Sequence, residues 1–182
     1  SHICVNCFFG PGANDENTNW HQAWSVGANY NASFEGFDIG LSAGYNEAQA
    51  PENGLAGKDQ QQYTFGGNLG FAGFTVGGSY AEEVSSLRMD GHAWEAGAQY
   101  NTGPVTVSVN YLSTEHKGTV LGDGQDEETQ ALSGAVGYAL GPGIDVSATV
   151  MWAEHEDDSD NASGPGSDQD GVALILGTSF VF

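Results

Sequence analysis

Basic residues are almost missing from this sequence. Three lysines and arginines stand against 24 aspartates and glutamates, so the 182 residues carry a formal net charge of −21. Nucleic-acid binding needs clustered Lys and Arg to neutralise phosphates, and the composition therefore excludes nucleic acid as a partner. Docking on an anionic membrane surface is disfavoured for the same reason, because basic residues mediate it.

Long apolar runs are also missing. Nowhere does the chain approach the roughly 20 consecutive apolar residues of a membrane-spanning helix. A β-barrel needs an apolar side chain only at every second position of each strand, so a membrane protein of that kind is not excluded. The sequence also lacks a secretory signal with a basic start and an apolar core, and we expect it to be a mature chain or a fragment.

Cysteine is limited to Cys4 and Cys7. A redox Cys-x-x-Cys motif needs a helix start in a thioredoxin-like setting, and no such pattern surrounds them. A zinc site needs two further ligands, but the five histidines are scattered. On a strand, positions three apart face opposite sides of the sheet, which disfavours shared metal binding. We interpret residues 1–9 as an atypical N-terminal segment, with a strand as one interpretation, and assign the two cysteines no function.

The last twelve residues, 171–182, carry no charge and alternate strictly. On one face lie Leu174, Leu176, Phe180 and Phe182, with Thr178 interrupting the apolar series. In water such a strand would promote aggregation, whereas in an outer membrane it is typical of the strand that closes a barrel.

The same alternation recurs from Trp20 onward in nine segments of about ten residues, the length of a tilted membrane-spanning strand. The opposite face of each segment is small and polar. Tight turns alternate with long acidic loops, and the turns are predicted at Glu35-Gly36, Ala72-Gly73, Gly103-Pro104 and Pro142-Gly143. The pattern predicts an all-β protein, a transmembrane antiparallel up-and-down barrel over residues 10–182, with residues 1–9 as a candidate tenth strand. A soluble sandwich shares the alternation but not this turn pattern.

Aromatic residues sit at the ends of these segments, while Val, Ala, Leu and Ile occupy the middles. Two membrane–water interfaces select Trp and Tyr in this way. The predicted interface residues are Trp24, Phe34, Phe37, Tyr45, Tyr63, Phe71, Phe74, Tyr80, Trp94, Tyr111, Trp152, Phe180 and Phe182.

Several glycine–aromatic units repeat along the strands, among them residues 27–30, 40–45, 77–80, 97–100 and 134–138, before the terminal residues 177–182. In these units the chain resembles a Gram-negative general porin of the alphaproteobacterial type. The resemblance implies an integral outer-membrane protein forming trimers of sixteen-stranded barrels, each a water-filled channel for small hydrophilic solutes. It also implies that about ten C-terminal strands are present here. The alternative is a small closed outer-membrane barrel with a structural, adhesive or loop-mediated binding role.

Charge in the lumen sets the selectivity of such a channel. The predicted pore-lining residues are Asp38, Glu47, Glu95 and Asp145, and an acidic wall would concentrate cations. An alternative interpretation makes Asp38 and Asp145 solvated turn residues at the periplasmic rim. Neither a nucleophile elbow nor histidines at metal-binding spacing accompany these acids, so we expect no enzyme activity and no cofactor.

The densest acidic stretch is residues 154–170. Calcium takes six to eight oxygen ligands, which closely spaced carboxylates supply, although the EF-hand pattern is absent. A calcium ion held there could bridge the protein to lipopolysaccharide, and the default alternative is a solvated loop. The predicted ligands are Asp157, Asp158, Asp160, Asp168 and Asp170.

Overall fold

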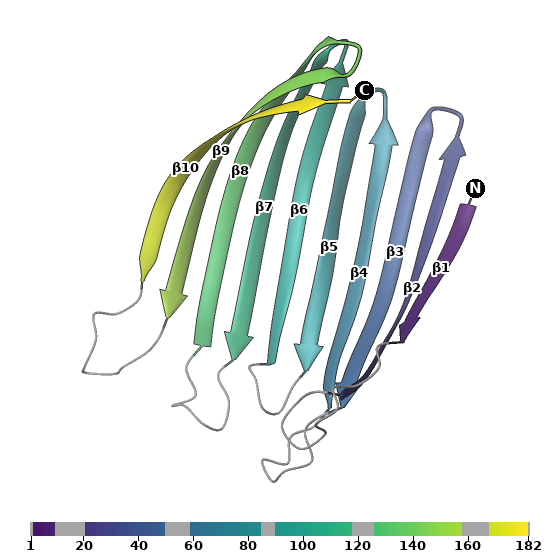
Figure 1. The fold of residues 1–182 in the computed structure, drawn as a ribbon, viewed down its shortest axis with the longest axis vertical. Coiled ribbons are helices and arrows are strands. Elements are labelled where there is room, and N and C mark those ends of the chain that lie inside the picture. The colour runs from purple at the N-terminus through teal and green to yellow at the C-terminus, as the bar shows by residue number, and fades with distance from the viewer. Residues whose placement is uncertain are drawn as a thin grey trace.

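The computed structural model describes residues 2–9, 21–49, 59–84, 90–117, 126–157 and 168–181. These residues form one antiparallel sheet of ten strands that follow one another in chain order (Figure 1). No helix in this part of the chain is long and apolar enough to cross a membrane. The strands are β1 (His2–Phe9), β2 (His21–Phe34), β3 (Phe37–Gln49), β4 (Gln60–Phe71), β5 (Phe74–Val84), β6 (Asp90–Thr102), β7 (Val105–Lys117), β8 (Asp126–Gly141), β9 (Ile144–Asp157) and β10 (Gln169–Phe180).

Four tight turns join β2 to β3, β4 to β5, β6 to β7 and β8 to β9, at the positions that the sequence predicts. They gather at one end of the sheet (Figure 1). We call this the turn end, and the opposite end the loop end. Each turn contains a glycine with positive φ, and in the β4–β5 turn Ala72 (φ 50°) also adopts this conformation before Gly73 (φ 85°). Two consecutive residues with positive φ match the right-handed twist of the flanking strands, which favours a two-residue hairpin.

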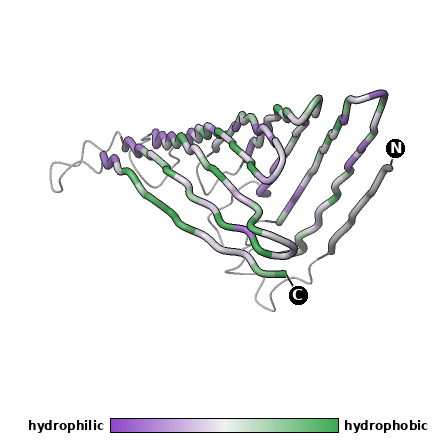
Figure 2. Tube along the Cα trace, turned by 90° about the horizontal axis from the view of Figure 1, so that it is seen from above, coloured by the Kyte–Doolittle hydropathy of each residue, from purple (hydrophilic) through white to green (hydrophobic). Residues whose placement is uncertain are grey.

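The register places the side chains on two contrasting faces. The apolar face carries rows such as Ile39–Leu69–Val76, whereas the polar face carries rows such as Ser42–Gly66–Ser79. Hydropathy mapped on the chain follows the same alternation along the curved sheet (Figure 2). Because successive side chains of a strand point to opposite faces, each strand presents apolar side chains on one face and polar side chains on the other.

Apolar side chains of the described residues are exposed rather than packed into a core. Ala32 is the single buried apolar residue among them, at 6% exposure, while Leu174 and Leu176 on β10 are 67% and 74% exposed. A soluble sandwich would bury these residues against a second sheet, and no second layer exists in the described part of the chain. The all-β, antiparallel up-and-down architecture is therefore confirmed, and the described residues do not form the alternative sandwich.

The two edge strands, β1 and β10, are each paired on one side only within the described residues. Figures 1 and 2 show a sheet that twists and bends along its width, as expected for strands of right-handed twist.

Candidate functional site

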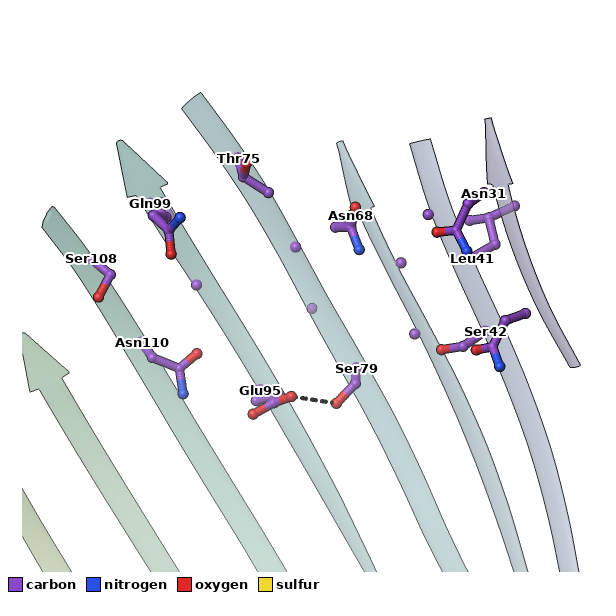
Figure 3. Close-up of a pocket in the computed structure, with 18 of the residues that line it drawn as sticks. Asn31, Leu41, Ser42, Asn68, Thr75, Ser79, Glu95, Gln99, Ser108 and Asn110 are labelled. Carbon is purple, nitrogen blue, oxygen red and sulfur yellow. Dashed lines mark hydrogen bonds between the residues drawn. The ribbon is translucent and has the colours of Figure 1, made fainter. Parts of the chain in front are cut away.

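A hollow of about 480 Å³ lies on the polar face, spanning β2 to β7 (Figure 3). Most of its side chains are amides and hydroxyls, and glycines separate them. Because the strands present every second residue to this face, each of the six strands contributes one or two polar side chains. The polar lining side chains are Asn29, Asn31, Ser42, Asn68, Thr75, Ser79, Glu95, Gln99, Ser108 and Asn110.

Glycines let the polar side chains of neighbouring strands lie flat against the sheet. A Cβ atom added at Gly40 would lie 2.7 Å from Nδ2 of Asn68, and one added at Gly97 would lie 2.7 Å from Oδ1 of Asn110. These distances are too short for real contacts, so each amide occupies the space that a neighbouring side chain would otherwise fill. The result is an open polar wall with few groups projecting from it.

Glu95 brings a charge to the middle of this wall. It stands on β6, opposite Ser79 on β5 and Leu112 on β7. The Ser79 hydroxyl donates a hydrogen bond to Oε1 of Glu95 over 3.0 Å, which holds the carboxylate in place (Figure 3). The resulting wall is polar and carries a fixed negative charge.

Asp38 and Asp145 lie on the same polar face as Glu95, close to the turn end. Asp38 accepts a hydrogen bond from the Ser33 hydroxyl over 2.6 Å. Asp145 lines a second hollow of about 430 Å³ between β7, β8, β9 and β10. Their positions agree with the rim of a channel and equally with its wall. The pore-lining role of Asp38 and Asp145 therefore stays a prediction.

Glu47 lies on the opposite, apolar face. It stands across from Trp24 and Gln61, and its Oε2 accepts a hydrogen bond from the Tyr45 hydroxyl over 2.5 Å. Glu47 follows Tyr45 by two residues along β3, and residues two apart on a strand point to the same face. The structure thus separates Glu47 from the three other predicted pore-lining acids.

The polar face carries four further ionisable residues at the loop end that are not among the predicted pore-lining residues: Glu83, His116, Glu127 and His155. Glu127 stands opposite His116 in the register. The Gln60 amide donates to the Glu83 carboxylate, and the Thr129 hydroxyl lies 2.8 Å from Nδ1 of His155. The alternation of faces, continued beyond the apolar part of each strand, predicts that these residues lie on the polar face.

The basic residue Lys117 does not face the hollow. Its Nζ lies 3.5 Å from Oε1 of Glu115, and Oε2 of the same carboxylate lies 3.7 Å from Nε2 of His92. The register puts these three residues on the apolar face at the loop end. Lys58 and Arg88 lie outside the described residues. Across the described polar face, therefore, no lysine or arginine balances Glu95.

The structure only partly covers the predicted calcium ligands. Asp158 and Asp160 lie outside the described residues, and the side chain of Asp157 does too. Asp170 pairs with Glu154 on the apolar face. Within the described ranges, no group of three or more His, Cys, Asp or Glu side chains could hold a metal ion. Calcium binding by residues 157–170 stays a prediction.

The predicted interface aromatics form two belts on the apolar face. At the turn end, Phe37 stacks on Phe71 with ring centroids 4.5 Å apart, and Phe74 stacks on Tyr100 at 4.2 Å. Phe34 and Phe180 also lie towards this end, and Phe182 lies outside the described residues. The loop-end belt comprises Trp24, Tyr45, Tyr63, Tyr80, Trp94, Tyr111 and Trp152.

The loop-end belt crosses the sheet obliquely. Tyr45 and Tyr63 share one row of the register, Tyr80 and Trp94 share the next row towards the turn end, and Tyr111 occupies the row after that. A flat membrane interface would intersect the strands in this stepwise manner if they tilt, as strands of membrane barrels do. The stepwise belt therefore indicates that the strands are tilted relative to the membrane normal.

An apolar face without a core, two aromatic belts and an open polar face define an integral membrane protein that crosses the bilayer with strands. The sequence matches the Gram-negative porin family over residues 8–158. The chain belongs to that family and is an integral outer-membrane protein.

Solved structures agree on the fold. OccAB3 of Acinetobacter baumannii superposes with a TM-score of 0.62 at 12% identity, covering 86% of this chain and 48% of OccAB3. A refined porin structure superposes with a TM-score of 0.61 at 17% identity, covering 99% of this chain and 58% of the porin chain. A loop-deletion mutant of OmpT, an outer-membrane protein of Vibrio cholerae, gives 0.62 at 13% identity, covering 98% and 58%. The chain thus spans about half the length of these structures. A search of curated protein sequences finds no match.

Proposed function

We propose that the polar face lines a water-filled channel through the outer membrane, which passes small hydrophilic solutes by passive diffusion. The open polar wall carries this proposal. A narrow barrel is filled by its own interior side chains, whereas here the amides of Asn68 and Asn110 lie flat over glycines and leave the wall clear. Such a channel works by shape and field, without making bonds, so no catalytic group or cofactor is needed.

The channel closes only if both edges of the described sheet are paired. An unpaired strand edge inside the hydrocarbon layer leaves backbone groups without hydrogen bonds, which costs several kcal/mol per group. Both β1 and β10 present such an edge within the described sheet. The solved porin is longer than this chain, which covers 58% of it. We propose that six further strands complete a sixteen-stranded barrel, that the barrel assembles as a homotrimer, and that outer-membrane lipid and lipopolysaccharide surround it.

The wall is expected to prefer cations. Glu95 carries a negative charge at its centre, Asp38 and Asp145 add charge near the turn end, and no described lysine or arginine faces them. Fixed charges of one sign concentrate the opposite ion, and salt screens this effect over about 10 Å at 0.1 M. The preference should therefore weaken as the salt concentration rises.

Reconstitution of the full-length protein in a planar bilayer tests the proposal. We expect stable conductance steps and a reversal potential, across a salt gradient, that favours cations. Glu95→Gln should lower the cation-to-anion permeability ratio about twofold in dilute salt, because it removes a wall charge and keeps the side-chain size. Glu47→Gln is the matched control, since it removes the same charge from the other face. An absence of conductance, or equal effects of both substitutions, would contradict the proposal.

A further inference from the structure

Polar side chains at the two ends of the polar face hydrogen-bond to one another. Near the turn end, the Thr106 hydroxyl donates to Oδ1 of Asn101 over 2.8 Å. At the loop end, the Asn46 amide donates to Oε1 of Gln62 over 2.8 Å. Each of these hydrogen bonds takes up part of the hydrogen-bonding capacity of the two side chains.

The amides in the middle of the same face are unpaired. Within the described residues, Asn29, Asn31, Asn68 and Asn110 make no hydrogen bond to another side chain, and all four line the hollow around Glu95. Figure 3 shows Asn31, Asn68 and Asn110. Asn68 stands on β4 and Asn110 on β7, so their free groups lie on either side of the Ser79–Glu95 pair. The middle of the wall therefore offers solutes an array of side-chain amides that are not hydrogen-bonded to other side chains.

The chemistry of this array favours one class of solute. Each amide presents two N–H donors and one carbonyl acceptor, and the hydroxyls of Ser42 and Ser108 present both functions. Sugar hydroxyls likewise donate and accept, and the fixed Glu95 carboxylate can accept strong hydrogen bonds from them. The Glu95 charge repels an anion, and a cation attracted by that charge leaves the amide N–H donors unused.

We propose that the hollow around Glu95 is a weak subsite for neutral polyhydroxylated solutes, namely sugars and polyols. The inference rests on the proposed channel function and names a solute class for it. Its affinity is low, because every lining group is also reached by water and each new hydrogen bond replaces one to water. Weak binding suits a channel, since a solute must both enter the site and leave it.

Block of the ion current by a sugar tests this subsite. A neutral trisaccharide such as raffinose, added to the full-length protein in a planar bilayer, should reduce the current with half-block at millimolar concentrations. The double variant Asn68→Ala/Asn110→Ala should raise the half-blocking concentration about tenfold, the combined effect of losing two neutral hydrogen bonds. Asn46→Ala, whose amide is already paired with Gln62, is the control and should leave the block unchanged.

The outcomes separate this inference from the proposed function. Conductance of the double variant without sugar shows that it has assembled. A conducting channel whose sugar block is the same in the double variant and in Asn46→Ala overturns the subsite and leaves the channel intact. Absence of any conductance overturns the channel itself.

Discussion

Val76→Arg is expected to prevent most of the protein from assembling in a membrane. Val76 is 50% exposed and lies on the apolar face between Leu69 and Ala98, inside the two aromatic belts. An arginine on the lipid-facing side of a membrane strand costs about 2–4 kcal/mol near the middle of the bilayer. Refolding into lipid vesicles, followed by the shift in gel mobility between folded and heated samples, measures the folded fraction.

Thr75→Arg is the matched control for this substitution. Thr75 is the preceding residue on β5 and lines the hollow on the polar face. The same guanidinium there faces water, so the folded fraction should stay near that of the parent protein, while the reversal potential moves towards anions. Equal losses of folded protein in the two variants would show that the faces are wrongly assigned.

Gly143→Ala is expected to destabilise the folded protein by about 2–5 kcal/mol. Gly143 has φ +75°, where a Cβ atom costs roughly 1–2 kcal/mol. That Cβ would also lie 2.3 Å from the backbone oxygen of Val181, and forced overpacking typically adds about 1–3 kcal/mol. The clash falls on the residue whose N–H donates to Gly143 O over 2.8 Å, so the end of β10 should detach from the β8–β9 turn.

Gly103→Ala separates strain from steric clash in the same experiment. Gly103 has φ +55° in the β6–β7 turn, but a Cβ added there meets nothing within 4 Å. Only the backbone strain applies, so the expected loss is about 1–2 kcal/mol. Unfolding by urea in detergent micelles gives both values. Equal destabilisation by the two alanines would show that the Cβ clash with Val181 adds nothing to the backbone strain.

Much of the fold could be predicted because strand alternation is local. Once Phe37 is assigned to the apolar face, the two-residue period places Ile39 and Leu41 beside it, and the turn at Ala72-Gly73 sets the pairing of β4 with β5. These assignments depend only on neighbours along the chain. The same count also places Glu47 beside Tyr45, on the face opposite Asp38.

The hollow itself could not be predicted, because its contacts cross between strands joined by long loops. Ser79 and Glu95 belong to β5 and β6, and no tight turn sets their register. The fit of the Asn68 amide over Gly40 likewise depends on how β3 pairs with β4 across residues 50–59. Loop length leaves such pairings open, so only the three-dimensional structure separates the unpaired amides from the paired ones.

The central claim is that the polar face lines an open aqueous channel. The most direct test is the single-channel conductance of Asn110→Cys, in a background with Cys4 and Cys7 replaced by serine, before and after a charged, membrane-impermeant thiol reagent. Val109→Cys, one residue away on the apolar face, serves as the control. We expect a stepwise drop in conductance for the Asn110→Cys channel and none for the Val109→Cys channel. An unchanged conductance at position 110, with a drop at position 109, would contradict it.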